Sequence, residues 1–475
     1  MQPTMVQTIH DTRVEIPPDR LSSLAARIAG EVLDSGHPSY DAARAVWNGL
    51  IDKKPGVIVR CSGVADVMTA VKFASENDLR IYVRGGGHNV AGACMDEAGL
   101  TIDLSSMRAV HVDPLKHTAR VQGGARLSDV DHETQAFGLA APLGVVSATG
   151  VAGLTLHGGM GWLLRKHGLS IDSLRSVDIV TADGQLRRAD REQNPDLFWA
   201  VRGGGGSFGV VTAFEFRLHP VGPRVWLSVP IYPIERAPEI MRQFNDYMQS
   251  APDELMGLGV FWSAPEAPEV PAQYHGKPVV ILLGCYTGPF DQGEQVIAPL
   301  RRMGTPLADL SGPMPWTAVQ KFLDADYPDG DFYYWKSIFL DRLDPQVVRT
   351  LSNHHALRPS GLSSIDVWTL GRAMRRVEPT ETAFYKRDAP YMIGIEANWK
   401  NRSDTDANIQ WARRLHDDLQ KLAPGGNYLN FPGFFEDRES LLRGSFGPNL
   451  ARLRSVKAEY DPANLFAGAV GIDTK

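Results

Sequence analysis

The sequence is poor in cysteine and contains no long apolar run. Its 475 residues include three cysteines, Cys61, Cys94 and Cys285, whose wide spacing forms neither a disulfide framework nor a CxxC metal-binding pattern. No stretch of about 18 apolar residues is present, so no membrane span is expected. The N-terminal stretch is polar and lacks the apolar core of a secretory signal. These absences predict reduced thiols, a cytoplasmic location and no membrane partner.

The charge balance shows no strong excess of either sign. Lys and Arg number 49 against 55 Asp and Glu, which gives a net charge of −6. Such a balance gives no support to a nucleic-acid-binding protein. The apolar fraction of 43% is ordinary, and the length suggests about two or three domains with a large core.

The common nucleotide-binding fingerprints are also missing. No GxGxxG lies between a predicted strand and helix, and no GxxxxGK[ST] occurs. Runs of glycine are present instead, at 85–87, 158–159 and 203–206, with a further patch at 122–127. Successive glycines offer backbone N–H groups without side chains, a geometry that cradles phosphate oxygens. Several such loops favour an extended anion such as a dinucleotide pyrophosphate, with plain structural turns as the alternative.

The first glycine run ends a predicted β-α-β unit. Residues 56–60 read as a buried strand, the stretch from Val64 has an apolar helical face, and 80–83 reads as a second strand. The sequence "VRGGGHNVAG" follows directly and presents His88. Since each glycine costs about 0.5–1 kcal/mol inside a regular element, the run predicts a close approach of the backbone to a ligand beside this imidazole.

Further elements follow along the first half. Residues 117–124 predict a strand, and the next stretch predicts a helix through Leu127 and Val130. The stretch 176–189 predicts a hairpin that turns at Gly184. The stretch 194–201 predicts a helix with Asn194 as its N-cap.

The second half differs in character after about residue 222. Longer apolar and aromatic strands are predicted at 224–233, 255–264, 278–288, 332–340, 363–371 and 391–399, with helices at 291–303 and 404–422. This pattern predicts a largely antiparallel sheet backed by helices. Its aromatic side chains either form a wall for an organic substrate or belong to the core.

Four separated motifs together resemble a known family. They are "VRGGGHNVAG", "GLTLHGGMGWLLRKHGLSIDSL", "DLFWAVRGGGGSFGVVTAFEFRLHP" and "YDPANLF". In this order they resemble the FAD-linked oxidases of the vanillyl-alcohol oxidase / p-cresol methylhydroxylase (PCMH) superfamily, in the berberine-bridge-enzyme-like branch. The resemblance implies an α+β fold with three parts. A PCMH-type FAD-binding domain of two α/β subdomains spans 1–222, a substrate-binding domain spans 223–430, and a berberine-bridge-like segment spanning 431–475 returns to the FAD domain.

The resemblance also implies the cofactor and its attachment. The cofactor is FAD, and His88 is implied to join the 8α-methyl of its ring covalently, with non-covalent FAD beside His88 as the alternative. Val146 stands where many relatives have a second attaching cysteine, so a single attachment is expected. The other implied cofactor-binding residues are Arg84, Gly85, Gly86, Gly87, Asn89, Val146, Gly150, Gly153, Leu154, His157, Gly158, Gly161, Gly209, Val210, Val211 and Asn430.

Two departures from the family pattern bear on the chemistry. His157 replaces a glycine that is usual there, and it either faces the flavin or is structural. The family's frequent YxNY motif, whose last tyrosine serves as a base, is "YLNF" here and ends in Phe431. Replacement candidates for the catalytic base are Asp366, Glu396 and Tyr428. The spacing in "YLNF" would place Tyr428 on the other face of a strand. An amine that arrives partly deprotonated would need no strong base.

The activity that the resemblance implies is oxidation of a small organic substrate. The substrate is an alcohol, an amine or a polyketide- or alkaloid-like compound, and hydride passes to flavin N5. The expected acceptor is O2, which yields H2O2, in secondary metabolism or catabolism. The alternatives are a dehydrogenase that uses another acceptor and a flavin-dependent cyclase without net oxidation. No metal is expected.

Overall fold

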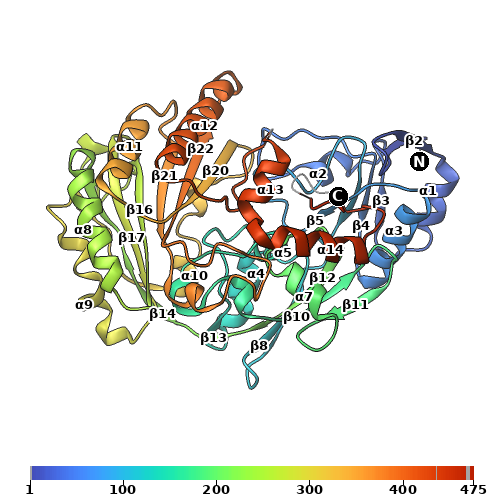
Figure 1. The fold of residues 1–475 in the computed structure, drawn as a ribbon, viewed down its shortest axis with the longest axis horizontal. Coiled ribbons are helices and arrows are strands. Elements are labelled where there is room, and N and C mark those ends of the chain that lie inside the picture. The colour runs from blue at the N-terminus through green and yellow to red at the C-terminus, as the bar shows by residue number, and fades with distance from the viewer. Residues whose placement is uncertain (1–2, 435, 467–470, 475) are drawn as a thin grey trace.

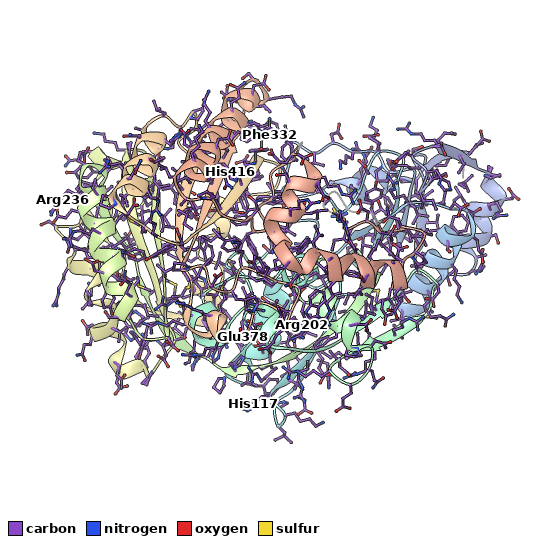
Figure 2. The ribbon with its side chains drawn as sticks, in the orientation of Figure 1. His117, Arg202, Arg236, Phe332, Glu378 and His416 are labelled. Carbon is purple, nitrogen blue, oxygen red and sulfur yellow. The ribbon has the colours of Figure 1, made fainter. Side chains whose placement is uncertain are left out.

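The computed structural model describes residues 3–434, 436–466 and 471–474. It has two halves that lie side by side (Figure 1), with the smaller sheets in one and a single large sheet in the other. Figure 2 shows His117 and Phe332 at opposite margins of the molecule. Within the described ranges, no helix combines the length and apolarity that crossing a bilayer requires.

The first half begins with the predicted β-α-β unit. Strands β4 and β5 are joined by helix α3, and both pair in parallel with β6, which lies between them. The apolar face of α3 is buried through Val67, Ala70 and Val71. The elements of this part are β1 (Thr4–Gln7), β2 (Arg13–Ile16), α1 (Pro18–Ala25), β3 (Glu31–Leu33), α2 (Tyr40–Arg44), β4 (Val57–Arg60), α3 (Val64–Glu76), β5 (Ile81–Arg84) and β6 (Leu100–Asp103).

A five-stranded antiparallel sheet follows, in the order β11-β10-β12-β8-β7. The predicted hairpin is confirmed as β10 and β11, and Gly184 has a φ of +70° in its turn. The elements are β7 (Val110–Asp113), β8 (Thr118–Gln122), α4 (Leu127–Gln135), β9 (Leu139–Ala140), α5 (Val151–Leu156), α6 (Leu164–His167), β10 (Leu174–Val180), β11 (Leu186–Ala189), α7 (Pro195–Val201), β12 (Val210–Arg217) and β13 (His219–Pro220).

Asn194 is confirmed as the N-cap residue of helix α7, but its side chain does not cap the helix. Asn194 has a φ of +47° and makes no capping hydrogen bond. Its Nδ2 donates instead to the carbonyl of Arg188 at 2.7 Å, so it closes the preceding loop. Pro195 begins the helix without a side-chain cap, because its ring fixes φ near the helical value.

The second half contains the predicted large antiparallel sheet. All six predicted strand regions are confirmed, and the path runs β18-β15-β17-β16-β21-β22-β20 with β14 and β19 beside it. The strands are β14 (Arg224–Ser228), β15 (Pro230–Pro233), β16 (Leu255–Ser263), β17 (Pro278–Tyr286), β18 (Ala308–Asp309), β19 (Gly312–Pro315), β20 (Phe332–Leu340), β21 (Ser364–Thr369) and β22 (Tyr391–Trp399).

Helices cover one face of this sheet, and the other face turns toward the first half (Figure 1). The predicted helix over 404–422 is confirmed as α12. The predicted helix over 291–303 is confined to α9 between short 3₁₀ turns, because Pro299 cannot continue the hydrogen-bond ladder. The helices are α8 (Ala237–Ser250), α9 (Gly293–Ile297), α10 (Trp316–Val319), α11 (Pro345–Ala356) and α12 (Thr405–Leu422).

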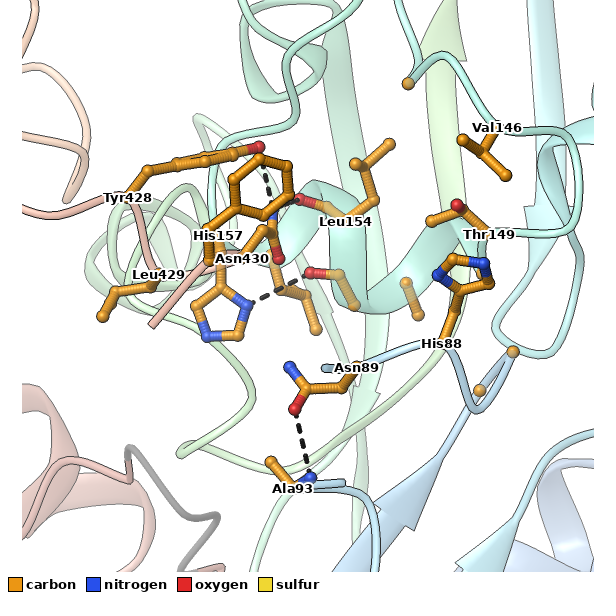
Figure 3. A pocket seen from close by; sticks show the side chains of 18 of the residues that line it. His88, Asn89, Ala93, Val146, Thr149, Leu154, His157, Tyr428, Leu429 and Asn430 are labelled. Atoms are coloured by element: carbon orange, nitrogen blue, oxygen red, sulfur yellow. Dashed lines mark hydrogen bonds between the residues drawn. The ribbon is translucent and has the colours of Figure 1, made fainter. Parts of the chain in front are cut away.

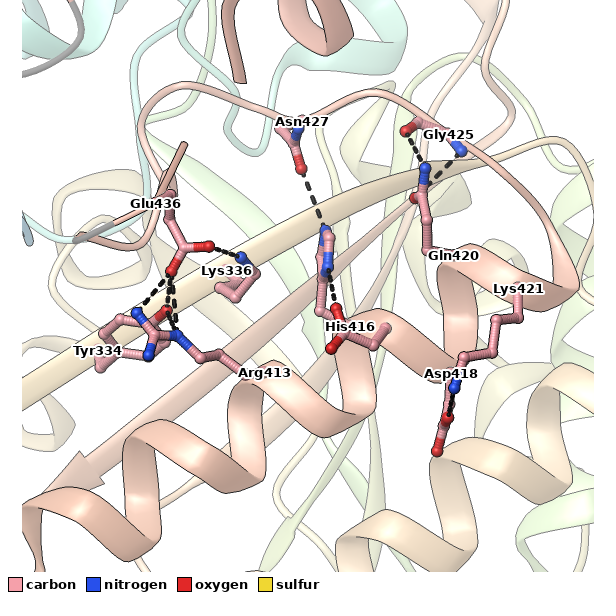
Figure 4. A network of polar contacts seen from close by, with 11 residues as sticks. Tyr334, Lys336, Arg413, His416, Asp418, Gln420, Lys421, Gly425, Asn427 and Glu436 are labelled. Carbon is pink, nitrogen blue, oxygen red and sulfur yellow. Dashed lines mark hydrogen bonds and ion pairs between the residues drawn. The ribbon is translucent and has the colours of Figure 1, made fainter. Parts of the chain in front are cut away.

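The chain then leaves the large sheet through an irregular stretch that polar contacts hold in place (Figure 4). Glu436 accepts hydrogen bonds from Lys336 of β20 at 2.7 Å and from Arg413 of α12 at 3.1 Å. Asn427 bonds His416 of α12 at 3.2 Å. These contacts tie residues 427 and 436, on either side of the stretch, to helix α12 and to the edge strand β20.

Two last helices, α13 (Arg438–Phe446) and α14 (Leu450–Tyr460), return to the first half. At the end of α14, the fully buried Lys457 pairs with Asp461 at 2.5 Å. Its Nζ also donates to the carbonyls of Ser207 at 2.7 Å and Phe466 at 2.8 Å. This buried pair ties the C-terminal segment to the glycine loop that precedes β12.

Candidate active site

The glycine loops of the first half contact one another through their main chains. A Cβ placed on Gly86 would lie 2.5 Å from Gly150 Cα, and one on Gly150 would lie 2.4 Å from Gly86 N. No side chain fits at either position. A Cβ on Gly153, by contrast, meets nothing within 4 Å, and one on Gly206 has its nearest neighbour at 3.9 Å. Those two glycines border open space.

This space is a cavity between the glycine loops and the large sheet. One wall contains the loop after β5, helix α5 and the loop before β12. The opposite wall contains side chains of β16, β20, β21 and β22. The irregular stretch from Tyr428 to Phe431 closes it on a further side. The cavity therefore lies between the glycine loops and the aromatic strands, two regions far apart in the sequence.

His88 lines the cavity directly after β5 (Figure 3). Its ring stacks on Trp47 with centroids 4.1 Å apart. Its Nε2 is buried and has no hydrogen-bond partner in the described part of the chain. Burial lowers the pKa of His88 to about 4, and the charge of Arg126 acts in the same direction. The imidazole is therefore neutral at pH 7, with a nitrogen available to react.

Most of the other predicted cofactor residues also line the cavity. These are Gly85, Gly86, Gly87, Asn89, Val146, Gly150, Gly153, Leu154, His157, Gly209, Val211 and Asn430. Asn89 holds its own loop, since its Oδ1 accepts from the amides of Ala91 at 3.0 Å and Ala93 at 3.1 Å.

The structure places four predicted cofactor residues outside the cavity lining. Arg84 turns its guanidinium toward the carbonyl of Ala43. Gly158 packs on Phe384, and Gly161 packs against the carbonyl of Leu143. Val210 precedes the lining residue Val211 on β12, so its side chain points to the opposite, buried face.

His157 lies near Asn430, on the far side of α5 from His88 (Figure 3). Its Nδ1 lies 3.1 Å from the carbonyl of Gly153. Burial lowers its pKa, so the ring is neutral and donates from Nδ1 to that carbonyl. Nε2 then lies toward Gly205, where a Cβ would be 2.6 Å away.

The residues of this wall fit an FAD. The open space over Gly153 and Gly206 is bordered by backbone without side chains, which suits a diphosphate and its flanking groups. His88 lines the same cavity, and its buried Nε2 has no hydrogen-bond partner among the described residues. Buried polar atoms are rarely left unpaired, so this nitrogen beside an open cavity supports a ligand there.

The opposite wall carries two carboxyl groups that the sequence marked as candidate bases. Strands β21 and β22 pair antiparallel, with Asp366 opposite Gly394 and Glu396 opposite Ser364. Both carboxyl side chains line the cavity. Asp366 Oδ1 accepts from Ser364 Oγ at 2.9 Å. Glu396 Oε2 accepts from the hydroxyl of Tyr327 at 2.7 Å.

Burial changes the proton affinity of this carboxyl pair. It raises the pKa of Asp366 to about 7. The pKa of Glu396 rises well above its ordinary value, through burial first and the nearby Asp366 charge second. The hydrogen bond from Tyr327 opposes this rise only in part. At neutral pH the pair therefore holds at least one proton, as two close buried carboxyl groups do.

Tyr428 also lines the cavity, and the spacing argument that placed it on the far face is wrong. The stretch around it is irregular, so strand alternation does not apply. Its hydroxyl accepts from the amide of Met160 at 3.2 Å and from Asn430 Nδ2 at 2.8 Å. Burial raises the pKa of Tyr428 to about 12, so it keeps its proton at neutral pH. It suits a hydrogen-bond donor and not a base.

Sequence reasoning missed several residues of the cavity. Tyr327 follows the short 3₁₀ turn Asp324–Asp326, and no periodic pattern marks it. Asp324 in that turn accepts from the amide of Ser147 at 2.8 Å and from its hydroxyl at 2.6 Å, which ties Tyr327 to the loop of Val146. The aromatic density of the strands was the signal available for Trp262 and Trp335, which also line the cavity.

Comparison with known proteins agrees with this site. The profile of the FAD binding domain family matches residues 55–190. The family described as berberine and berberine like matches residues 427–473. The two matches contain the loop of His88 and the stretch that carries Tyr428 and Asn430.

Relatives match over nearly the whole chain. An FAD-linked oxidoreductase of Bacillus subtilis (strain 168) is 30% identical over 93% of this chain and 96% of its own. The (R)-6-hydroxynicotine oxidase of Paenarthrobacter nicotinovorans is 29% identical, covering 94% of this chain and 97% of its own.

A solved structure shows the same fold. The crystal structure of 6-hydroxy-D-nicotine oxidase from Arthrobacter nicotinovorans superposes with a TM-score of 0.84 at 27% identity, covering 94% of this chain and 98% of that one. The glycine wall and the large antiparallel sheet are the features expected of the family that these matches indicate. The chain belongs to the FAD-linked oxidoreductases of the PCMH-type, berberine-bridge-enzyme-like group, with a berberine-like C-terminal segment.

Proposed function

We propose that this protein is an FAD-dependent oxidase of a small organic substrate, with its FAD joined to the chain through His88 alone. Bound FAD would supply a two-electron acceptor for hydride, and O2 would reoxidise the reduced flavin with formation of H2O2. One observation carries the proposal. A neutral imidazole, whose buried Nε2 has no partner among the described residues, and a buried carboxyl pair lie on opposite walls of one cavity.

The attachment follows from the groups within the cavity. His88 offers a neutral nitrogen, and its ring is held by stacking on Trp47. Val146, in the position of a second attaching cysteine, is aliphatic. Cys94 lines the cavity, but burial raises the pKa of its thiol, so it is a poor nucleophile. We therefore assign a single attachment.

The residues of the sheet wall move the proton that accompanies oxidation. We assign the carboxyl pair of Asp366 and Glu396 as proton acceptor for the substrate O–H or N–H. A base is most effective when its pKa lies near the working pH, and the pKa of Asp366 is about 7. Tyr327 orients Glu396 through its hydrogen bond, and Tyr428 keeps an O–H hydrogen to donate to a ligand.

Different parts of the chain are assigned to cofactor binding and to substrate binding. We propose that residues 1–222, with 431–475, hold the cofactor, and that residues 223–430 hold the substrate. We also assign His157 to the cofactor wall, because its ring lines the cavity and its Nδ1 is fixed by the carbonyl of Gly153.

The acceptor is tested by reducing the purified holoenzyme without air and then admitting O2. Rapid recovery of the oxidised flavin spectrum with one H2O2 per flavin is the expected result. Slow recovery in air, with fast recovery on an artificial electron acceptor, would show a dehydrogenase instead. For any substrate found, a product lighter by two hydrogens indicates oxidation, and a product of unchanged mass indicates a cyclase.

A further inference from the structure

The substrate side of the cavity carries two carboxyl groups. Asp366 and Glu396 are both buried there, at 6% and 3% exposure. Among the described residues that line the cavity, no lysine or arginine occurs. An anionic substrate would find no counter-charge and would be repelled by any ionised carboxylate. A cation would be attracted to the pair in a low-dielectric setting, where such attraction is strong.

Aromatic rings surround these carboxyl groups. Trp335 lies edge-on to Tyr327, with ring centroids 5.4 Å apart, and edge-on to Phe431 at 4.9 Å. Trp262 and Trp368 line the same cavity. Aromatic faces bind organic cations and also the apolar bodies that carry them. This wall therefore suits a ligand with one positive group on an apolar skeleton.

A position without a side chain lies beside the carboxyl pair. Gly394 stands opposite Asp366 and two residues before Glu396, on the same face of β22. A Cβ there would lie 3.4 Å from Glu396 Oε1 and 3.5 Å from both Asp366 Cβ and Phe431 Cε2. These are ordinary contacts, and the φ of Gly394 is not positive, so neither packing nor backbone requires glycine. Its absent side chain leaves room for a small group between the carboxyls.

Trp368 gives an independent sign of a ligand. The residue is 4% exposed and lines the cavity two positions after Asp366. Its indole Nε1 is buried and has no hydrogen-bond acceptor in the described part of the chain. A buried N–H without an acceptor is unfavourable, and a ligand oxygen or nitrogen that accepts from it would remove that cost.

We propose that the cavity takes a protonated organic amine, with its nitrogen held by Asp366 and Glu396 over Gly394 and its apolar body between the tryptophans. A hydrogen-bond acceptor elsewhere on the amine receives the indole N–H of Trp368. Tyr327 holds Glu396 in place from the side, through its 2.7 Å hydrogen bond. The substrate class rests on the proposed oxidase function, whereas the binding preference does not.

Calorimetric titration of the holoenzyme with three probes of one skeleton tests the preference. The probes are phenethylamine, phenethyl alcohol and phenylacetate, measured without air at pH 8. The amine should bind about tenfold tighter than the alcohol or more, as a charge-assisted hydrogen bond provides, and phenylacetate should bind weakest. Equal binding of amine and alcohol, tightest binding of phenylacetate, or no amine binding at millimolar concentration would overturn the proposal.

Variants locate the preference at the carboxyl pair. In Glu396→Gln and Asp366→Asn the amine should lose most of its advantage over the alcohol. Asp131→Asn is the matched control, because Asp131 is a buried carboxyl that bonds Trp316 and Gln320 outside the cavity lining. Gly394→Ala, which a methyl fits without a clash, should weaken amine binding several-fold with an unchanged melting temperature. An unchanged amine preference in both carboxyl variants would contradict the assignment.

Turnover separates this inference from the proposed function. Amine-selective binding without flavin reduction by any amine would leave the binding site standing and remove the oxidase assignment. Oxidation of alcohols, with no selectivity for amines in binding, would keep an oxidase and remove the amine site.

Discussion

The wall that carries His88 consists of main chains in contact, whereas the facing wall consists of large side chains on straight strands. Gly86 and Gly150 approach so closely that a methyl group would collide with backbone. On the facing wall, Trp335, Trp368 and Glu396 project from paired strands of the large sheet. Backbone N–H groups suit a cofactor whose phosphates are always the same. Side chains suit a substrate, because they change without disturbing the sheet.

The facing wall should give the largest effect on turnover. Glu396→Gln keeps the shape and removes one member of the carboxyl pair that accepts the proton, so kcat/KM should fall by about 10²–10⁴-fold while FAD content stays unchanged. Steady-state kinetics on the best substrate from an amine and alcohol panel measures this. Asp131→Asn should retain full activity. A kcat/KM of Glu396→Gln within a factor of three of the native value would show that Glu396 takes no part in accepting the proton.

Substitutions that disturb the support of the cofactor wall should lower the free energy of unfolding most. Lys457→Met leaves Asp461 buried without its partner and frees the carbonyls of Ser207 and Phe466, at a cost of about 3–5 kcal/mol in the free energy of unfolding. Urea denaturation of both proteins measures the loss. Lys421→Met breaks only an exposed ion pair with Asp418 and should change stability by less than about 0.5 kcal/mol. Similar values for the two variants would contradict a structural role for the buried pair.

Two alanine substitutions separate packing from cofactor binding within the glycine wall. Gly86→Ala forces its methyl against Gly150 and should cost about 1–3 kcal/mol in stability. Gly153→Ala meets no protein atom and lies in helix α5, so the apoprotein should keep its stability or gain about 0.4–1 kcal/mol. Gly153→Ala should nevertheless lower FAD incorporation, measured by flavin absorbance per chain. Normal incorporation would place the cofactor away from α5.

The pH profile gives the smallest and most specific effect. The carboxyl pair accepts a substrate proton only after it has lost one of its own. Since the pKa of Asp366 is raised to about 7, log kcat/KM should rise with pH below about 7 and level off above it. Asp366→Asn removes the group that sets this limb, so the limb near pH 7 should be lost and replaced by that of Glu396. Tyr327 donates to Glu396 and lowers its pKa, so adding Tyr327→Phe to Asp366→Asn should move the remaining limb to higher pH. A flat profile from pH 5 to 9 would exclude the pair.

Local sequence patterns predict much of the fold. The hairpin predicted over 176–189 and the apolar face of α3 correspond to β10 with β11 and to a buried helix, because each pattern is set by neighbours a few residues apart. The insertion of β6 between β4 and β5 was not predictable in this way, because strand order depends on contacts far apart in the chain. Asn194 stands at the predicted N-cap position, but its amide bonds the preceding loop instead of the helix, which local sequence does not reveal.

The two walls also differ in how far the sequence reveals them. The glycine run marks His88 within ten residues of sequence. Asp366 and Glu396 were found by strand periodicity, but only the pairing of β21 with β22 shows that they act together. Tyr327 escaped detection because an irregular turn carries it, and Tyr428 was misplaced because its stretch is not a strand.

Intact mass of the denatured protein tests the central claim most directly. The native chain should carry the added mass of one FAD, and peptide mapping should place it on His88. His88→Ala should show the mass of the bare chain. The variant should otherwise keep its fold, including the cavity around Trp47. A native protein without added mass, or flavin found on Cys94 instead, would contradict the account.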